Sequence, residues 1–290
     1  MDKLTVSIVN YNGGQFIIDC LNLVKLLSNE VSLKVYVVDN ASKDGSIEKI
    51  QENFPEVETI INKENLGFGK SQNLVLKKTK DEYILILNPD VEIKKGVLKK
   101  LLEYLESHKN IGVITPKIIL QNGELDLAAH RGFPTPLASF LYTFFKNDSL
   151  YHLTQRDMNE IHEVDSISGA FFLTRKDVLA SVGYFDEDFF MYGEDIDLCF
   201  RIKEAGYKVV YYPEVEVIHH KGISSGLKKD TQKMTTADKE TKMRSVDAFY
   251  EAMKIFYRKH YEKNYAAIVN WLVYLGINLK WMQAKRKLVV

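Results

Sequence analysis

Residues 4–39 read LTVSIVNYNGGQFIIDCLNLVKLLSNEVSLKVYVVD, and this stretch sets the expected fold. Residues 4–9 and 34–38 are short apolar runs rich in β-branched side chains, which is typical of buried strands. Between them, apolar side chains recur at helical spacing over residues 16–27. A strand, a helix and a second strand in this order predict a β-α-β unit with two parallel strands.

The same alternation continues along the chain. Strands are predicted at 59–61, 83–87 and 112–120, and helices at 46–54, 70–78 and 97–105. This order predicts an α/β fold with a Rossmann-like, mostly parallel sheet covered by helices on both faces. Such sheets bind ligands beyond the carboxyl ends of their strands, and Asp39 and Asp90 follow closely after two predicted strands. We therefore expect both acids at one crevice.

The rest of the chain is less regular. Asn122 and Gly123 predict a hairpin turn leading into an extended segment at 124–127. Poor periodicity, with Pro134 and Pro136 inside it, predicts an irregular insertion over 130–163. The later predicted elements are a strand at 164–173, helices at 176–182 and 194–205, extended segments at 208–212 and 215–219, and helices at 246–261 and 266–282.

Composition excludes some classes of protein. Lysine plus arginine and aspartate plus glutamate balance at 39 each over 290 residues, so no net charge recruits nucleic acid. Cys20 and Cys199 lie in apolar periodic segments, which predicts buried free thiols and a reducing compartment. The N-terminus predicts a first strand and no signal peptide, so we expect a cytoplasmic protein.

Acidic and aromatic side chains alternate unusually densely over residues 183–201. The five carboxylates of its first part are Asp186, Glu187, Asp188, Glu194 and Asp195, set around Phe185 and the aromatic run 189–192. A core rejects the charges and a plain surface rejects the aromatic rings, so the pattern predicts a cleft wall. Glu194 or Asp195, at a helix start, is a candidate general base. Asp197 and Arg201 are expected to pair on the helix at i and i+4.

Three other segments suggest ligand contacts, each with a plainer alternative. Asn88-Pro89-Asp90 suits Mg²⁺ or Mn²⁺, yet it is also an ordinary turn sequence. Asp39 suits a nucleotide, yet it also suits turn formation. The loop with Asn65 and Gly67 lets backbone approach a ligand, although it matches neither the dinucleotide pattern nor the P-loop.

Six motifs in order resemble those of family 2 glycosyltransferases of the GT-A fold. They are VSIVNYN (6–12), VVDNASKDGS (37–46), NLGFGKSQN (65–73), LNPD (87–90), SGA (168–170) and GEDIDLCFR (193–201). The chain most resembles the rhamnosyltransferase-like branch that builds bacterial cell-surface polysaccharides. The resemblance implies a GT-A domain over 1–226 and leaves 227–290 as a helical C-terminal extension.

The resemblance implies an inverting transfer of a sugar from a nucleoside diphosphate donor to a saccharide or lipid-linked saccharide acceptor. Rhamnose from dTDP-rhamnose is the first expectation for the donor, and a UDP-hexose is the alternative. Asp39, Asn10 and Tyr11 would hold the nucleotide, with Asn65 and Gly67 nearby. Asp195 would be the base, and Glu194 would orient the acceptor.

The resemblance also implies a divalent cation, Mg²⁺ or Mn²⁺, bound by Asp90. Asn88 stands where many members have a first aspartate, which leaves its role as a ligand open. His219 or His220 would complete the site, and alternation along a strand lets only one of them face the cleft. The match to His-x-x-Gly favours His219, and residues 221–226 would form a loop that closes over the donor.

Other hypotheses remain open. A sugar nucleotidyltransferase would want a basic glycine-rich loop, and residues 10–14 contain no lysine or arginine. A carbohydrate-binding scaffold on a degenerate enzyme fold is the non-enzymatic alternative. The apolar helix at 266–282, followed by basic residues 285–287, is interrupted by polar residues and falls short of a membrane span. It would contact the inner membrane face peripherally, pack on the core, or form a homodimer.

Overall fold

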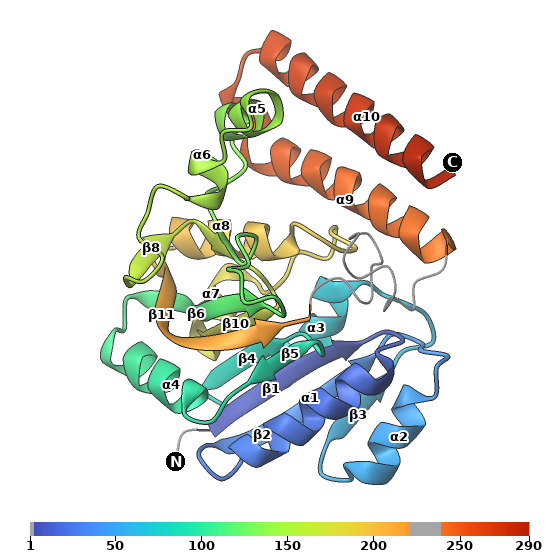
Figure 1. Ribbon diagram of the computed structural model, residues 1–290, viewed down its shortest axis with the longest axis vertical. Coiled ribbons are helices and arrows are strands. Elements are labelled where there is room, and N and C mark those ends of the chain that lie inside the picture. The colour runs from blue at the N-terminus through green and yellow to red at the C-terminus, as the bar shows by residue number, and fades with distance from the viewer. Residues whose placement is uncertain (1–2, 221–238, 290) are drawn as a thin grey trace.

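The computed structural model describes residues 3–220 and 239–289, and a single large sheet lies at its centre (Figure 1). Within these residues the sheet has nine strands. They are β1 (Lys3–Asn10), β2 (Ser32–Asp39), β3 (Glu58–Ile61), β4 (Tyr83–Leu87), β5 (Val91–Ile93), β6 (Ile111–Leu120), β8 (His162–Val164), β10 (Phe171–Arg175) and β11 (Lys208–His219).

The strand order is β3-β2-β1-β4-β10-β6-β11-β5, with β8 paired to β11. The first four strands are all parallel, as the opening β-α-β unit predicts. β10 enters antiparallel between β4 and β6, whereas β6 and β11 are parallel to each other. The predicted mostly parallel sheet is confirmed, with β5, β8 and β10 running against the other strands.

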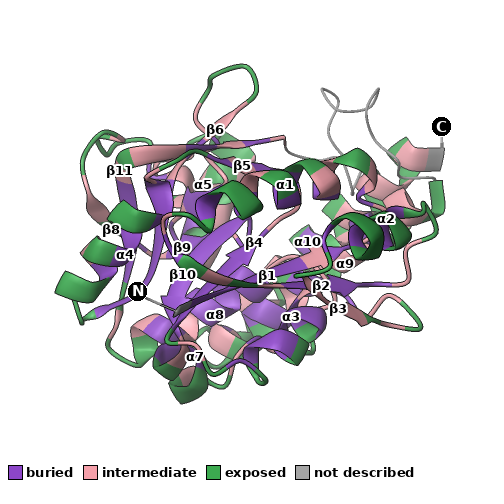
Figure 2. Cartoon of the chain, turned by 90° about the horizontal axis from the view of Figure 1, so that it is seen from below, coloured by how far each residue is buried: buried purple, intermediate pink, exposed green. Residues whose placement is uncertain are grey.

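Helices cover both faces of the sheet. On one face lie α1 (Gly14–Leu27), α2 (Ser46–Asn53) and α4 (Val97–Ser107); on the other lie α3 (Phe68–Leu76), α7 (Lys176–Val182) and α8 (Glu194–Glu204). Alternate residues of β4 serve the two cores: Leu85 and Leu87 belong to the first, and Ile84 and Ile86 to the second. The strands are therefore buried on both sides while the outer helix faces are exposed (Figure 2).

The insertion at 130–163 is more regular than its sequence suggests, so that prediction was wrong in part. It contains a helix, α5 (Pro136–Phe145), and a short turn of helix, α6 (Ser149–His152). Pro136 stands in the first turn of α5, where a missing N–H costs nothing, and Thr135 caps the helix by accepting the N–H of Ala138 over 3.1 Å. The prolines start this helix and do not prevent it.

Three strand predictions also need correction. The segments at 208–212 and 215–219 form one strand, β11, which carries an irregularity between Tyr212 and Glu216 that accommodates Pro213. The predicted strand at 164–173 is divided into β8, β9 (Ser166–Ile167) and β10; β9 pairs with β7 (His130–Arg131) in a separate small sheet. The turn at Asn122-Gly123 is present, but its return arm makes only an isolated bridge, Ile119 to Leu125.

The C-terminal part forms a helical hairpin, α9 (Lys239–His260) and α10 (Ala267–Val289), joined through the short helix η2 (Glu262–Asn264). α9 shares a hydrophobic cluster with the acid-aromatic stretch, in which Phe189 and Ile196 pack with Phe256. The expected helical extension is thus present and packs on the sheet domain. The expected boundary at residue 226 and the expected loop at 221–226 lie outside the described residues. In the described parts of the chain, no helix has both the length and the hydropathy that a membrane crossing requires.

Candidate active site

Two parallel strands end side by side at a buried amide and carboxylate. Asn10 ends β1 opposite Asp39, which ends β2, and the Asn10 side chain donates to Asp39 Oδ1 over 2.8 Å. The other oxygen of Asp39 accepts the backbone N–H of Ser42 over 3.0 Å. The structure therefore brings Asn10 and Asp39 together, and the same carboxylate also fixes the loop after β2.

The loop before α3 packs against the acid-aromatic stretch. Gly67 has φ of 84°, and a Cβ built on it would lie 2.1 Å from the carbonyl oxygen of Phe190. That oxygen accepts the N–H of Phe68 over 2.9 Å, and Asn65 Oδ1 accepts the N–H of Gly67 over 2.9 Å. Gly67 does permit close approach of backbone, as its type suggests, but the partner seen here is Phe190.

Tyr11, just beyond β1, is contacted by the C-terminal hairpin. Arg244 of α9 donates to the Tyr11 hydroxyl over 2.9 Å, and its guanidinium lies 5.5 Å from the centre of the Tyr11 ring. The same guanidinium lies 5.9 Å from the ring of Phe190, within reach of a cation–π contact. α9 therefore extends to the strand end where the nucleotide is expected.

Asp90 and His219 form the second group of strand-end residues. His219 ends β11, and its Nε2 lies 3.3 Å from Asp90 Oδ1 while its Nδ1 lies 3.2 Å from Asp126 Oδ2. All three residues are at most 9% exposed. Although burial opposes it, the two carboxylates raise the pKa of His219 to about 9.

His219 and His220 face different partners. His220 Nε2 lies 2.5 Å from Glu92 Oε1, and the backbone N–H of His220 donates to the carbonyl of Asp90 over 2.9 Å. Of the two histidine side chains, His219 is thus the one beside the Asp90 carboxylate. The ring of His220 is paired with Glu92, and its hydrogen bond to Asp90 is made by the backbone N–H.

The donor set at Asp90 fits a divalent cation that takes most of its ligands from a substrate. In proteins a ligand histidine commonly has its second ring nitrogen on a carboxylate, as His219 does with Asp126. Mg²⁺ and Mn²⁺ sites often use one or two carboxylates together with substrate phosphates. Over residues 3–220 and 239–289, no three His, Cys, Asp or Glu side chains are arranged to hold an ion by themselves. A complete protein cage is therefore not present in this part of the chain.

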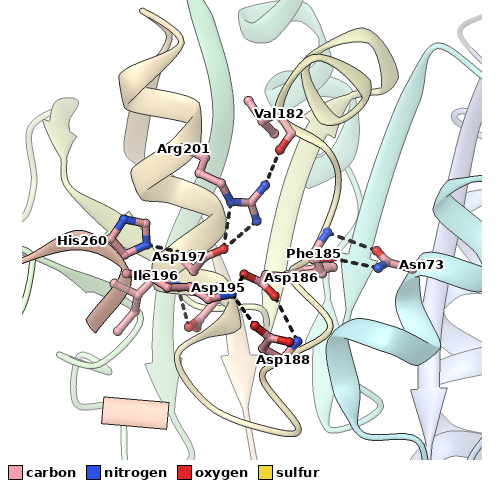
Figure 3. A network of polar contacts seen from close by, with 11 residues as sticks. Asn73, Val182, Phe185, Asp186, Asp188, Asp195, Ile196, Asp197, Arg201 and His260 are labelled. Carbon is pink, nitrogen blue, oxygen red and sulfur yellow. Dashed lines mark hydrogen bonds and ion pairs between the residues drawn. The ribbon is translucent and has the colours of Figure 1, made fainter. Parts of the chain in front are cut away.

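Asp195 lies in the first turn of α8 and accepts from three donors, one of which is the backbone N–H of Ile196, 2.8 Å from Asp195 Oδ1 (Figure 3). Its Oδ2 accepts from Arg131 Nη2 over 3.1 Å and from the backbone N–H of Gly169 over 3.2 Å. Ala170 follows Gly169 in the chain, and its carbonyl oxygen accepts a hydrogen bond from the backbone N–H of Asn88 over 2.9 Å. The turn at 168–170 thus connects the Asp195 carboxylate to the segment that carries Asp90.

Glu194 is buried beside Asp195. It is 6% exposed, and its Oε2 has no hydrogen-bond partner among the described residues. Burial first, and then the Asp195 carboxylate, raise the pKa of Glu194. A raised pKa favours the protonated form, which can donate a hydrogen bond.

Asp197 and Arg201 pair on α8 as predicted. Asp197 Oδ2 accepts from Arg201 Nε over 2.9 Å and from Arg201 Nη2 over 2.6 Å. Figure 3 shows Asp197 between Arg201 and His260 of α9, whose Nε2 lies 2.8 Å from Asp197 Oδ1. Arg201 also donates to the carbonyl of Val182. These residues connect α8 to its neighbours and have a structural role.

The acid-aromatic stretch is not the continuous aromatic wall that its sequence suggests. Phe185 and Phe189 are 2% and 1% exposed and belong to two hydrophobic clusters. Asp186 and Asp188 both pair with Lys259 of α9. The prediction of a cleft wall was therefore wrong for Phe185 and Phe189, because the helices that bury them were not recognisable from this stretch alone.

Sequence reasoning missed three residues of the site: Arg131, Asp126 and Arg244. Each belongs to a segment without a motif, the first in the poorly periodic insertion, the second after a turn, and the third in the polar C-terminal part. Nothing in the local sequence distinguishes them from ordinary charged residues. Only tertiary contacts bring them to Asp195, His219 and Tyr11.

The chain is similar in sequence to a family of known proteins. A family model described as "Glycosyltransferase like family 2" matches residues 2–240. The chain is 29% identical over 242 residues to the "N-acetylglucosaminyl-diphospho-decaprenol L-rhamnosyltransferase" of Mycobacterium tuberculosis, covering 78% of each chain. It is 32% identical over 162 residues to "Rhamnosyltransferase WbbL" of Escherichia coli K12, covering 53% of this chain and 61% of that protein.

A solved structure shares the fold. It is the mannosyltransferase PcManGT from Pyrobaculum calidifontis, in complex with GDP-Man and Mn²⁺, with a TM-score of 0.56 at 16% identity. The match covers 99% of this chain and 72% of that one. The expected GT-A sheet with added C-terminal helices is thereby confirmed.

Proposed function

Because the chain belongs to glycosyltransferase family 2 and is a glycosyltransferase, we propose that it transfers a sugar with inversion from a nucleoside diphosphate donor to a saccharide or lipid-linked saccharide. One observation carries the proposal. The Oδ2 atom of Asp195 accepts from two donors, and the carboxylate is connected, through the turn at 168–170, to the segment of Asp90. The proposed base and the acid proposed to bind the cation thus lie on segments that hydrogen bonds connect.

Asp195 acts as the general base in this mechanism. The acceptor hydroxyl oxygen forms the bond to the anomeric carbon, and the bond from that carbon to the diphosphate breaks, so the nucleoside diphosphate leaves with the electron pair. The hydroxyl proton passes to the Asp195 carboxylate. Arg131 and the Gly169 N–H keep that carboxylate oriented, since both contact the same oxygen.

Glu194 orients the acceptor. Its carboxyl group is buried, its raised pKa favours the protonated form, and Oε2 lacks a partner in the described structure. A protonated carboxyl group donates a hydrogen bond to a sugar oxygen without adding a second negative charge beside Asp195.

Asp39, Asn10 and Tyr11 bind the nucleotide, supported by the loop that contains Asn65 and Gly67. Asp90 and His219 hold Mg²⁺ or Mn²⁺, and Asn88 positions Asp90 through its backbone bond to Ala170. The cation, when bound, neutralises the charge of the departing diphosphate. The complex of the mannosyltransferase PcManGT with GDP-Man and Mn²⁺ supports the choice of ion.

Rhamnose from dTDP-rhamnose is the favoured donor. The support comes from the names of the two relatives above, both rhamnosyltransferases. The mycobacterial name also supports a lipid-linked acceptor, because it specifies a diphospho-decaprenol. A UDP-hexose is the alternative donor, since the residues at the strand ends do not by themselves select one nucleobase of the donor.

The test is a donor panel with the full chain. dTDP-rhamnose, UDP-glucose and UDP-N-acetylglucosamine are each offered with Mn²⁺ and with a chelator. Water takes the place of the acceptor hydroxyl, and release of the nucleoside diphosphate by hydrolysis is measured. We expect release from dTDP-rhamnose, lost on chelation and lost in Asp90→Asn. Turnover that survives chelation contradicts the metal assignment, whereas turnover of only a UDP-sugar contradicts the donor assignment.

A further inference from the structure

Helix α10 is apolar on two opposite sides. On its inner side, Tyr274 and Ile277 face α9, and Ile277 is 8% exposed. On its outer side, Ile268, Leu272, Leu275, Leu279 and Met282 follow one another at spacings of four and three residues, and they are between 38% and 63% exposed. Such spacing places them on one stripe of the helix. A helix of this kind is suited to be covered on both sides, yet the described residues cover only the inner side.

A second apolar face lies at the same end of the molecule. Leu137, Phe140, Phe144 and Phe145 of α5 are 59%, 49%, 70% and 66% exposed. The ring of Phe140 contacts the other two phenylalanine rings, with 5.0 Å between the ring centres of Phe140 and Phe144 and 5.7 Å between those of Phe140 and Phe145. α5 and α10 both lie at the end of the long axis that is far from the sheet (Figure 1). We call these four residues, the α10 stripe and Trp271 the α5–α10 surface.

The charged side chains on α5 and α10 themselves have one sign. α10 contains Lys280, Lys285, Arg286 and Lys287, and neither α5 nor α10 contains an aspartate or glutamate. Lys285 pairs with Asp247 of α9 over 3.0 Å, whereas Lys280, Arg286 and Lys287 are exposed. The whole chain has no net charge, so this is a local excess of positive charge.

This charge pattern decides which occupant fits. In a two-fold dimer this patch would face the same patch of the second copy. Its lysine and arginine side chains would then need acidic side chains opposite them. The two helices offer none. A bilayer with anionic headgroups, by contrast, binds exposed leucine, phenylalanine and tryptophan together with lysine and arginine.

We propose that the α5–α10 surface docks onto a lipid bilayer that carries anionic headgroups, with α10 lying in the plane of the interface. The aromatic side chains, Trp271 at 59% exposed among them, enter the headgroup boundary, and the three exposed basic residues contact lipid phosphates. Docking requires no sugar transfer, so this inference stands apart from the proposed activity. α9 lies between α10 and α8, which carries Asp195, so a docked enzyme holds its site at a fixed height above the lipid (Figure 1).

The experiment is vesicle flotation of the full chain. Vesicles of phosphatidylcholine with about 30 mol% phosphatidylglycerol are compared with vesicles of phosphatidylcholine alone. We expect the chain to float with the anionic vesicles and much less with the neutral ones. The variant Lys280→Gln, Arg286→Gln, Lys287→Gln should partition about 100-fold more weakly, because each basic residue near an anionic surface contributes about fivefold.

A second variant tests the apolar contribution: Phe144→Ser, Phe145→Ser, Leu272→Ser and Leu279→Ser together. It should lose flotation while its melting temperature stays close to that of the wild type, since the four side chains are exposed. Matched controls on other helices and loops are Leu26→Ser with Ile61→Ser, and Lys95→Gln, Lys100→Gln, Lys109→Gln, all at exposed positions. The controls should float like the wild type.

Three outcomes overturn the proposal. The wild type fails to float with anionic vesicles, or the α5–α10 variants float as well as the controls. In the third, the wild type binds no vesicles and light scattering shows that it is a dimer. If this dimer dissociates in the variant with serine at Phe144, Phe145, Leu272 and Leu279, the surface is an interface between two copies.

Discussion

At the scale of single residues, Arg131 is the most informative member of the site that sequence reasoning missed. In the proposed mechanism it acts through the Asp195 carboxylate, to which it donates a hydrogen bond, so it is a positioning residue. Arg131→Gln should lower kcat about 10- to 100-fold, because one of the two donors to Oδ2 of the proposed base, Asp195, is lost. The KM for the donor should change little.

Steady-state kinetics of three variants check this. Arg131→Lys keeps the charge and should recover part of kcat, whereas Arg156→Gln, an exposed arginine in the same insertion, should behave like the wild type. A rise in KM at constant kcat would show that Arg131 binds substrate and does not orient the base.

His130 makes stability depend on pH. It is fully buried, and burial lowers its pKa from 6.5 to about 4. Because the pKa of His130 is lower in the folded chain, the unfolded chain binds more protons between pH 6.5 and pH 4. The contribution of His130 to the free energy of unfolding therefore keeps its full value above pH 6.5 and decreases as the pH falls toward 4. The loss from this one group is about 3 kcal/mol.

Urea unfolding at several pH values measures this contribution. His130→Phe retains a ring against Tyr211 and removes the titration, so its unfolding free energy should fall less steeply below pH 6.5. His108→Phe, at an exposed position, should retain the wild-type slope. Equal slopes in all three proteins would mean that His130 has the same pKa in the folded and the unfolded chain, which would contradict the lowering of its pKa by burial.

At the scale of secondary-structure elements, the junction of α8 with α9 depends on Asp197. This carboxylate is 1% exposed and receives Arg201 and His260. Asp197→Asn should lower the unfolding free energy by about 2–3 kcal/mol, because buried hydrogen bonds to a charged group are lost. Asp188→Asn is the matched control: its pair with Lys259 is solvent-exposed, and the change should cost less than about 1 kcal/mol. A comparable loss in both variants would contradict a structural role for Asp197.

Elements differed in how far their sequences revealed them. β4 and α7 have the predicted bounds, because an apolar run and a short helical period are complete within each segment. The sequence did not predict β5, because three residues at a sheet edge are too few to show an alternating pattern. It did not predict α5, because prolines near the start of this helix resemble a helix-breaking sequence. Long, locally consistent patterns can be predicted, whereas short edge strands and helices inside insertions depend on tertiary packing.

The candidate site divides in the same way. The strand-end acids Asp39 and Asp90 could be predicted because the parallel topology sends them to one edge. The partners Arg131, Asp126 and Arg244 could not, since each is an isolated charge whose position is set by distant segments. The aromatic run misled for a related reason: Phe185 and Phe189 are buried by helices remote in sequence.

At the scale of the whole molecule, three sets of contacts join the C-terminal hairpin to the sheet domain. α9 packs on Phe189 and Ile196, pairs with Asp197 through His260, and reaches Tyr11 through Arg244. Helix α9 therefore connects Tyr11 of the proposed nucleotide site, the helix that carries the proposed base, and the outer helix α10. A transferase that works at a lipid surface would benefit from such a connection, because docking of α10 would hold the base at a set height.

The decisive measurement is the turnover of Asp195→Asn with the accepted donor, together with calorimetric affinity for the matching nucleoside diphosphate. If Asp195 is the base, kcat falls at least about 100-fold while the nucleotide affinity stays within about twofold. Asp177→Asn, an exposed acid on α7, should match the wild type in both quantities. Near-wild-type turnover in Asp195→Asn would contradict the assignment of this carboxylate as the base.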